Sequence, residues 1–250
     1  MEQVYQEIAR KAEEEALGLS ELRREFHRHP EPGWMEFRTS GRIAELLQVY
    51  GCDAVLTGEQ VCKAEARMGV PEGGGMTGVI GILHCGAGPT VALRFDIDAL
   101  PVRECEELDH FPAQEGFRSE QEGYMHACGH DGHITVGLGT AKLLCQMREQ
   151  LHGTVKFIFQ PAEEGVRGAR AIVENGHLED VDFLLGAHMY GGSEQHPRGI
   201  CITAGHGLAT TKLDVDFHGK ASHAAAAPEQ GNNALLAAAT AVLNLQAIPR

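Results

Sequence analysis

The sequence predicts an α/β fold in which a mostly parallel sheet is flanked by helices. From residue 79 onward, short and almost continuously apolar runs alternate with helical segments, as is typical of strands that are covered on both faces. Near Ala209 the pattern changes to an alternation of polar and apolar residues, which indicates a half-exposed strand. We therefore expect a larger domain over 1–207 and the start of a smaller α/β domain over 208–250.

Two helices are expected before the first strand. Residues 3–28 have apolar side chains at helical intervals, and the sequence HPEPG at 29–33 ends that helix. Residues 39–50 form the second helix, and Gly51 suits the position just after its last turn. A glycine-rich loop at 70–78 then leads into the sheet.

Strands and helices alternate through the rest of the chain. Short apolar runs between turn-forming residues indicate buried strands, and longer segments with helical spacing indicate helices. The predicted strands are 79–83, 91–95, 155–159 and 183–187, and the predicted helices are 134–147 and 168–174. In the smaller domain, 211–217 is expected as a strand and 232–248 as a helix.

The composition excludes several classes of protein. The chain carries 35 acidic and 21 basic side chains, and this formal net charge of −14 argues against a nucleic-acid-binding surface, which requires a basic face. Its hydrophobic content of 43% is sufficient for a packed core. No run approaches the roughly 18 apolar residues of a membrane helix, and the N-terminal segment lacks a signal-peptide core. We therefore expect a cytoplasmic protein, in which the seven cysteines form no disulfide framework.

Polar side chains follow three of the predicted strands. Asp96 and Asp98 follow one strand, the QPAEEG segment at 160–165 follows another, and His188 follows a third. A further segment, HACGHDGH at 126–133, precedes a helix. Because ligands of open α/β sheets collect beyond the carboxyl ends of the strands, we expect these segments to meet at one edge of the sheet.

These segments contain the donor atoms of a divalent-metal site. Cys128 and His130 are separated by one glycine, so a bent loop can direct both side chains to one point. Glu163 and Glu164 are adjacent carboxylates whose mutual repulsion a dication would remove. One of them can bind the metal while the other accepts a proton from water, as a metal hydrolase requires.

Three other polar residues of the HACGHDGH segment are expected to support the site. For His126 and His133 we favour structural roles over direct metal ligation. Asp131 fits two roles equally well, as the cap of the following helix or as part of the catalytic site. Isolated histidines elsewhere in the chain are more typical of surface or core positions.

At these motifs the sequence resembles the amidohydrolase branch of the aminoacylase/carboxypeptidase-type dinuclear metallopeptidases. The resemblance extends through essentially the whole chain, and HACGHDGH together with QPAEEG is specific for the branch. The stretches GWMEFRT and ATTKLDVDF favour the aminobenzoyl-glutamate subgroup. The matching segments are RREFHRHPEPGWMEFRT, FDIDAL, MHACGHDGH, LHGTVKFIFQPAEEGVRGARA and LATTKLDVDFHGKASHAAAAPEQGNNALLAAA.

The resemblance implies a site for two divalent metal ions, Mn²⁺ or Zn²⁺. Glu163 matches the general base of the family, and Asp98 matches an aspartate that orients a neighbouring ligand. Cys128 matches the thiolate that bridges the two ions. The residues that match metal ligands are Cys128, His130, Glu164 and His188.

The resemblance also implies a catalytic α/β domain with a smaller α/β lid that mediates dimerisation. His223 matches a lid histidine that polarises the scissile carbonyl by reaching into the active site of the other protomer. Asn232, or its neighbour Asn233, is expected near the carboxylate of the substrate. The implied partners are an N-acyl amino acid and a second protomer, either identical or related.

The implied reaction is metal-dependent hydrolysis of the amide bond of an N-acyl amino acid. The favoured substrate is p-aminobenzoyl-glutamate, from which glutamate would be released. Glu163 would take a proton from the attacking water and return it to the leaving amine. The alternatives are a broader N-acyl-amino-acid or hippurate-type amidohydrolase and a non-catalytic assembly subunit. The joint presence of these residues, Cys128, His130, Glu163, Glu164 and His188, favours an enzyme.

The family pattern continues past Arg250 to a further metal-ligand histidine, which no residue of this sequence matches. We therefore expect these 250 residues to be either a fragment of a longer protein or a truncated product. We do not expect the residues on their own to be fully active.

Overall fold

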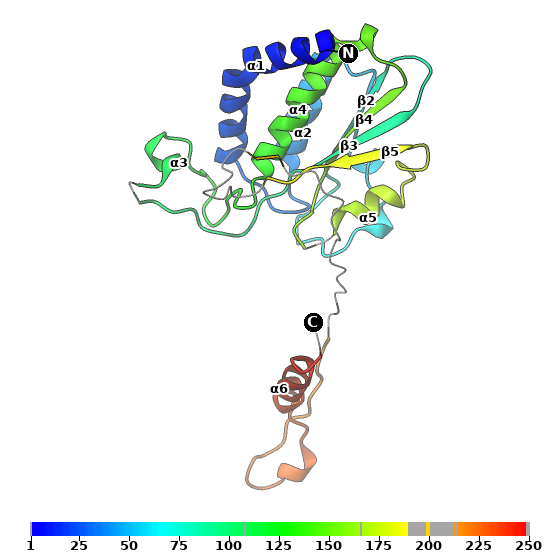
Figure 1. The fold of residues 1–250 in the computed structure, drawn as a ribbon. Helices are drawn as coiled ribbons and strands as arrows, with labels where there is room; N and C mark the ends of the chain where they lie inside the picture. The colour runs from blue at the N-terminus through cyan, green and yellow to red at the C-terminus, as the bar shows by residue number, and fades with distance from the viewer. Residues whose placement is uncertain are drawn as a thin grey trace. The chain divides into compact units, whose positions relative to one another are not determined.

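A computed structural model describes residues 2–107, 109–165, 167–189, 199–200, 213 and 215–248 of the chain. The chain divides into two units, Met1–Ile200 and Cys201–Arg250. The first unit contains a single five-stranded sheet with helices on it (Figure 1), which confirms the α/β class that the sequence predicts. The assignment of a catalytic domain and a lid to the two parts of the chain remains a prediction.

The sheet of the first unit is mixed. Its strands are β1 (Ala54–Thr57), β2 (Val79–His84), β3 (Thr90–Asp96), β4 (Thr154–Gln160) and β5 (Phe183–Gly186). They lie in the order β1-β2-β4-β3-β5, in which β3 runs parallel to β4 and β5 while β2 runs antiparallel to β4 and β1. Only residues 85–89 join β2 to β3. A connection between parallel strands needs about a dozen residues or more, so β3 runs antiparallel to β2. The parallel part of the sheet is the part that carries the polar segments.

Helices cover both faces of the sheet (Figure 1). α2 and α4 pack on one face, α1 packs along α4, and α5 packs against β4 on the opposite face. None of the helices among the described residues is long and apolar enough to cross a membrane. The helices are α1 (Glu2–Arg28), α2 (Phe37–Tyr50), α3 (Phe111–Gln114), α4 (His130–Gln146) and α5 (Gly168–Val173).

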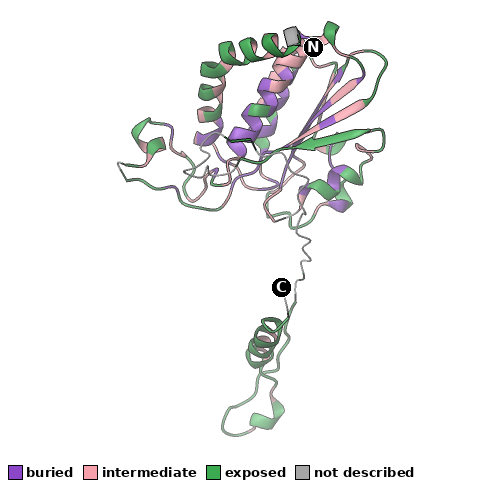
Figure 2. Ribbon diagram, in the orientation of Figure 1, coloured by how far each residue is buried: buried purple, intermediate pink, exposed green. Residues whose placement is uncertain are grey.

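Alternation along the strands divides the core into two layers. Phe157 and Phe159 of β4 lie in the layer beneath α2 and α4, whereas Ile158 between them lies in the layer beneath α5. Successive strand residues point to opposite faces, so one continuous apolar run supplies both layers. Figure 2 shows the buried residues gathered between the helices and the sheet, and β5 as an exposed edge strand.

α4 begins four residues earlier than the predicted helix at 134–147. Gly129 precedes its first turn with a φ of 86°, in the left-handed region that glycine tolerates best. This backbone turn sets the start of the helix, whereas the prediction relied on apolar spacing. His130 and His133 consequently lie three residues apart on one helix, and their rings stack with centroids 5.1 Å apart.

In the second unit, the predicted helix at 232–248 is shorter and forms α6 (Ala234–Leu245). It begins after Asn233, whose Oδ1 accepts a hydrogen bond from the Leu236 N–H at 3.1 Å and so caps the first turn. The predicted strand at 211–217 lies partly outside the described residues. Its described positions, 213 and 215–217, have no strand pairing within the part of the chain that the structure describes.

Candidate metal centre

The sheet brings the predicted polar segments to one edge. Asp96 pairs in register with Gln160 at the carboxyl ends of the parallel strands β3 and β4, so the segments after both strands start side by side. His188 follows β5, which runs parallel to β3, and the N-terminus of α4 supplies His130. This is the convergence at one edge that the sequence predicts.

Four predicted ligands lie close together at this edge. One donor atom from each of Cys128, His130 and Glu164 lies within 4.8 Å of the other two. His130 Nε2 lies 3.9 Å from Glu164 Oε1, and Cys128 Sγ lies 3.4 Å from His188 Nε2. Donor atoms that bind one ion at about 2.0–2.3 Å are typically about 3–4 Å apart, so these spacings suit a shared metal.

The two histidines of this group are oriented by main-chain carbonyls. His130 Nδ1 donates to Asp98 O at 2.7 Å, and His188 Nδ1 donates to Met189 O at 2.8 Å. With the proton on Nδ1, each ring directs the lone pair of Nε2 towards the cluster. This arrangement is typical of metal-binding histidines in proteins.

Buried donor atoms without partners indicate that a cation fits this site. His130 Nε2 and Glu164 Oε1 are buried, and neither has a hydrogen-bond partner among the described residues. Unsatisfied buried polar atoms are rare because they are costly, and thiolate, imidazole and carboxylate are the donors that divalent transition metals prefer. The residues present therefore fit a divalent metal.

The charges around the site lead to the same conclusion. Burial and the neighbouring carboxylate of Glu164 raise the pKa of the Cys128 thiol to about 12. Burial opposes protonation of His130, but its hydrogen bond to Asp98 and the charge of Asp96 overcome this and raise its pKa to about 9. Without a cation the cluster therefore retains protons, and a bound dication would release them because it stabilises thiolate and neutral imidazole.

Glu163 and Asp98, the predicted base and orienting residue, border the four donors. Glu163 Oε2 lies 3.9 Å from His130 Nε2. Burial and the charge of Asp96 raise the pKa of Glu163. Its side chain is 34% exposed against 23% for Glu164, so Glu163 is the more accessible of the two carboxylates. Asp98 Oδ2 accepts a hydrogen bond from the Glu164 N–H at 2.9 Å, which ties the two segments together.

Sequence reasoning did not assign Asp96 a role, and the structure places it beside the cluster. Its carboxylate binds His133 Nδ1 and lies 3.6 Å from His130 Nε2. His133 Nε2 accepts a hydrogen bond from the Met189 N–H at 2.8 Å, so both nitrogens of His133 have partners. These contacts suit the supporting role expected for His133. The FDID pattern, with two acids after a strand, was the available signal for Asp96.

The remaining polar residues of the HACGHDGH segment, His126 and Asp131, are buried. His126 is enclosed, and burial lowers its pKa to about 4, which keeps the ring neutral. Asp131 does not cap α4, because Gly129 holds the capping position. Instead, its carboxylate accepts a hydrogen bond from His27 Nδ1 at 2.9 Å and another from Arg23 at 3.1 Å.

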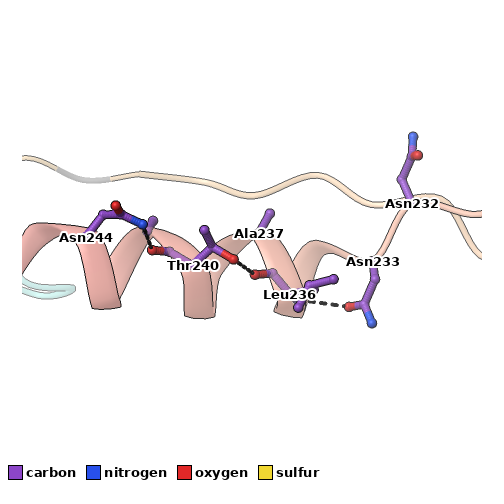
Figure 3. A pocket seen from close by; sticks show the side chains of 7 residues that line it. Asn232, Asn233, Leu236, Ala237, Thr240 and Asn244 are labelled. Carbon is purple, nitrogen blue, oxygen red and sulfur yellow. Dashed lines mark hydrogen bonds between the residues drawn. The ribbon is translucent and has the colours of Figure 1, made fainter.

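The predicted lid residues lie in the second unit. His223 Nδ1 accepts hydrogen bonds from the Ala225 and Ala226 N–H groups at 3.2 and 3.0 Å. Asn232 and Asn233 border a groove of about 620 Å³ along α6 (Figure 3), where Asn233 is engaged in capping. The relation of these residues to the metal centre remains a prediction.

Comparisons with known proteins agree with this site. Residues 92–249 match the model of peptidase family M20/M25/M40. Over 92% of its length the chain is 44% identical to one of the subunits of p-aminobenzoyl-glutamate hydrolase from Escherichia coli (strain K12), and it is 43% identical to the indole-3-acetyl-aspartic acid hydrolase of Enterobacter agglomerans over the same share. It spans 58% of the length of each of these relatives.

A solved structure supports the fold and the kind of site. The YXEP protein of Bacillus subtilis, a dinuclear metal binding peptidase from the M20 family, is 39% identical, with a TM-score of 0.57 over 69% of this chain and 42% of that chain. The resemblance predicted from HACGHDGH and QPAEEG is therefore confirmed. On this evidence the chain belongs to peptidase family M20/M25/M40.

Proposed function

We propose that the protein containing these residues is a metal-dependent amidohydrolase that releases an amino acid from an N-acyl amino acid. The observation that carries this proposal is the convergence of thiol, imidazole and carboxylate donors at one edge of the sheet, with a second carboxylate beside them. The proposed ligands are Cys128, His130, Glu164 and His188, and the proposed ions are two of Mn²⁺ or Zn²⁺.

The favoured substrate class is an aromatic acyl group joined to an acidic amino acid. The two relatives act, by name, on an aminobenzoyl and an indoleacetyl conjugate, and in both the amino acid is acidic. A cavity of about 510 Å³ beside Glu164 is bordered by Met35, Leu100 and Tyr124, which suits a flat apolar group. We favour p-aminobenzoyl-glutamate, and the near-equal identity to the second relative supports a broader N-acyl-amino-acid hydrolase as the alternative.

Glu163 is the proposed proton carrier. Bound ions would polarise the amide carbonyl and increase the acidity of water. Glu163 accepts a proton from the attacking water and then delivers it to the leaving nitrogen, a task that its raised pKa and partial exposure suit. The side chain of Asp98 accepts a hydrogen bond from the Glu164 N–H, and its main-chain carbonyl accepts one from His130 Nδ1. Asp98 thus keeps two proposed ligands in place.

His223 is proposed to polarise the amide carbonyl from a neighbouring protomer. Its Nδ1 accepts hydrogen bonds from two main-chain N–H groups. In the neutral ring the proton therefore lies on Nε2, which can donate a hydrogen bond. Asn232 is proposed to lie near the substrate carboxylate. We propose a cytoplasmic homodimer or a hetero-oligomer with a related subunit. The latter is supported by the relatives whose names describe them as single subunits of a larger hydrolase.

The proposed function is tested by measuring the release of amino acids by the full-length protein that contains these residues, loaded with Mn²⁺ or Zn²⁺. The panel contains p-aminobenzoyl-glutamate, indole-3-acetyl-aspartate and benzoylglycine, and the released amino acid is measured. Fastest release of glutamate supports the favoured substrate, whereas comparable rates support the broader hydrolase. No release from any conjugate would favour a non-catalytic role in assembly.

Glu163→Gln is the variant that separates chemistry from metal binding. It removes the proton carrier and keeps the size of the side chain, so we expect turnover to fall by about 10²–10⁴-fold with metal content unchanged by elemental analysis. Near-normal turnover in this variant would contradict the role of Glu163.

A further inference from the structure

Glu36 is a buried carboxylate that the proposed chemistry does not use. It directly precedes α2 and is 0% exposed. Its Oε1 accepts a hydrogen bond from the Ala162 N–H at 2.8 Å, and its Oε2 lies 2.6 Å from Thr77 Oγ1. Ala162 directly precedes Glu163, so this buried group is one residue away from the proposed base.

Glu36 is available for this contact because another residue caps the helix. Glu36 holds the capping position of α2, but its side chain makes no capping hydrogen bond. The carboxylate of Glu31 accepts the Arg38 and Thr39 N–H groups instead, at 3.1 and 2.7 Å. The ordinary capping task is therefore done by Glu31, and the side chain of Glu36 is directed to the segment that follows β4.

Ala162 is the point at which this segment changes direction. Its φ is 49°, in the left-handed region that a residue with a Cβ rarely adopts. The carbonyl of Ala162 accepts the Arg167 and Gly168 N–H groups at 3.1 and 2.9 Å, which closes the loop that carries both glutamates. Strained residues of this kind persist where the surrounding structure fixes them.

Two glycines leave room for this turn. A Cβ at Gly33 would lie 3.0 Å from the Cα and Cβ of Ala162, and a Cβ at Gly168 would lie 1.7 Å from Pro161 O. The turn is thus packed on both sides by backbone. The Ala162 N–H donates to Glu36, and a buried N–H without an acceptor is costly.

The segment 31–36 also supports the loop after β3. The carbonyl of Glu31 accepts the Ala99 N–H at 2.8 Å, and Ala99 directly follows Asp98. One short segment therefore contacts both loops that carry the proposed machinery. In the sequence this segment, EPGWME, contributed to the end of the first helix and to the resemblance, and its contacts give it a further physical role.

We propose that Glu36 is a positioning residue, which holds the left-handed turn at Ala162 and thereby directs Glu163 and Glu164 to their separate tasks. Glu36 touches neither the donor atoms nor the substrate cavity, and it acts through the Ala162 N–H. The effect on turnover rests on the proposed function, whereas the effect on the loop does not.

The test compares Glu36→Ala and Glu36→Gln in the full-length protein that contains these residues by two measurements. The first is hydrogen exchange of the peptide 161–168 in the metal-free protein. The second is kcat and KM for p-aminobenzoyl-glutamate after metal loading. In E36A we expect exchange in 161–168 to rise at least about tenfold and kcat to fall about 100-fold, with KM within about threefold. In E36Q the amide oxygen can still accept the Ala162 N–H, so both values should stay within about threefold of the parent.

Thr77→Val is the matched control, because it removes the other contact of Glu36 and leaves the Ala162 hydrogen bond in place. We expect its exchange in 161–168 to match that of the parent protein. If E36A does not fold, Glu36→Asp replaces it, since the shorter carboxylate should loosen the same peptide to a smaller extent.

Three outcomes would contradict the proposal. They are unchanged exchange in 161–168 in E36A, a uniform increase over the whole chain, and a loss in E36Q as large as in E36A. If the parent protein releases no amino acid, the proposed function fails, and the exchange measurement still decides the role of Glu36.

Discussion

At the scale of single residues, the sequence predicts the side-chain donors of the site but not the main-chain groups that orient them. Cys128, His130 and Glu164 stand in short motifs whose donor types and spacing predict a metal site, and the structure brings them within 4.8 Å of one another. The carbonyls that orient His130 and His188 belong to Asp98 and Met189. Main-chain groups carry no sequence signal, and so these contacts could be found only from the fold.

Glu36 gives a prediction on stability against pH. Burial raises the pKa of Glu36 from 4.5 to about 8. Between these values the unfolded chain has lost the proton while the folded chain retains it, so the free energy of unfolding falls as pH rises. Glu36→Gln has no proton to lose. We therefore expect denaturant titrations to show E36Q gaining stability relative to the parent, by a few kcal/mol, between about pH 5 and pH 8.

Glu104 is the control, because its pKa is shifted in the opposite direction to that of Glu36. Burial acts to raise its pKa, but hydrogen bonds from His27 and the Ser119 N–H outweigh this and lower it. A carboxylate with a lowered pKa in the folded state stabilises the fold at pH values above its pKa in the unfolded chain. This contribution is lost as the pH falls through its pKa in the folded state. Glu104→Gln should therefore be less stable than the parent at pH 7, and the deficit should shrink only as the pH falls below about 4.5. A parallel response of E36Q and E104Q to pH would contradict both assignments.

At the scale of elements, the sequence located the buried strands and missed the antiparallel edge. β2, β3 and β4 are apolar runs, and each was predicted within a residue or two at either end. β1 has four residues, of which three are half-buried and one is exposed, and it pairs only at the edge of the sheet. The mixed direction follows from the short connection at 85–89, a constraint of chain length that residue pattern alone does not express.

Two free cysteines from elements that are distant in the sequence lie close together, and they give a prediction on crosslinking. Cys52, which follows α2, and Cys145 of α4 have their Sγ atoms 3.9 Å apart. The hydrogen bond from Cys52 and the nearby Arg148 lower the pKa of Cys145. We expect diamide, which takes up two electrons and two protons, to convert the two thiols to a disulfide. A disulfide of this kind typically stabilises a fold by about 2–4 kcal/mol.

Peptide mass spectrometry without reductant identifies the linked pair, and thermal unfolding measures the gain. Cys52→Ser should abolish both the crosslink and the increase in Tm. Cys105→Ser is the matched control, because Cys105 is exposed, and it should retain both. If no disulfide between Cys52 and Cys145 is found after diamide treatment, the two sulfur atoms cannot approach to bonding distance in the folded protein.

At the scale of the whole molecule, the metal centre should couple folding to metal binding. The proposed ligands come from the segment after β4, the start of α4 and the segment after β5, so they meet only when the sheet is formed. A ligand that binds only the folded state at 100 times its Kd adds about 2.7 kcal/mol. For a unit of this size, such a gain corresponds to a rise in Tm of roughly 5–10 °C.

We therefore expect Mn²⁺ or Zn²⁺ to raise the Tm of the metal-free chain by that amount, and a chelator to reverse the rise. Cys128→Ala should remove most of the increase, because it takes away the thiol that lies 3.4 Å from His188 Nε2. His84→Ala should retain it. The exposed His84 contacts Thr154 at the opposite end of β4, away from Asp96 and Gln160, so its imidazole cannot reach the centre. An equal rise in C128A and H84A would mean that the ions bind elsewhere on this acidic chain, because only a site built from residue 128 distinguishes the two variants.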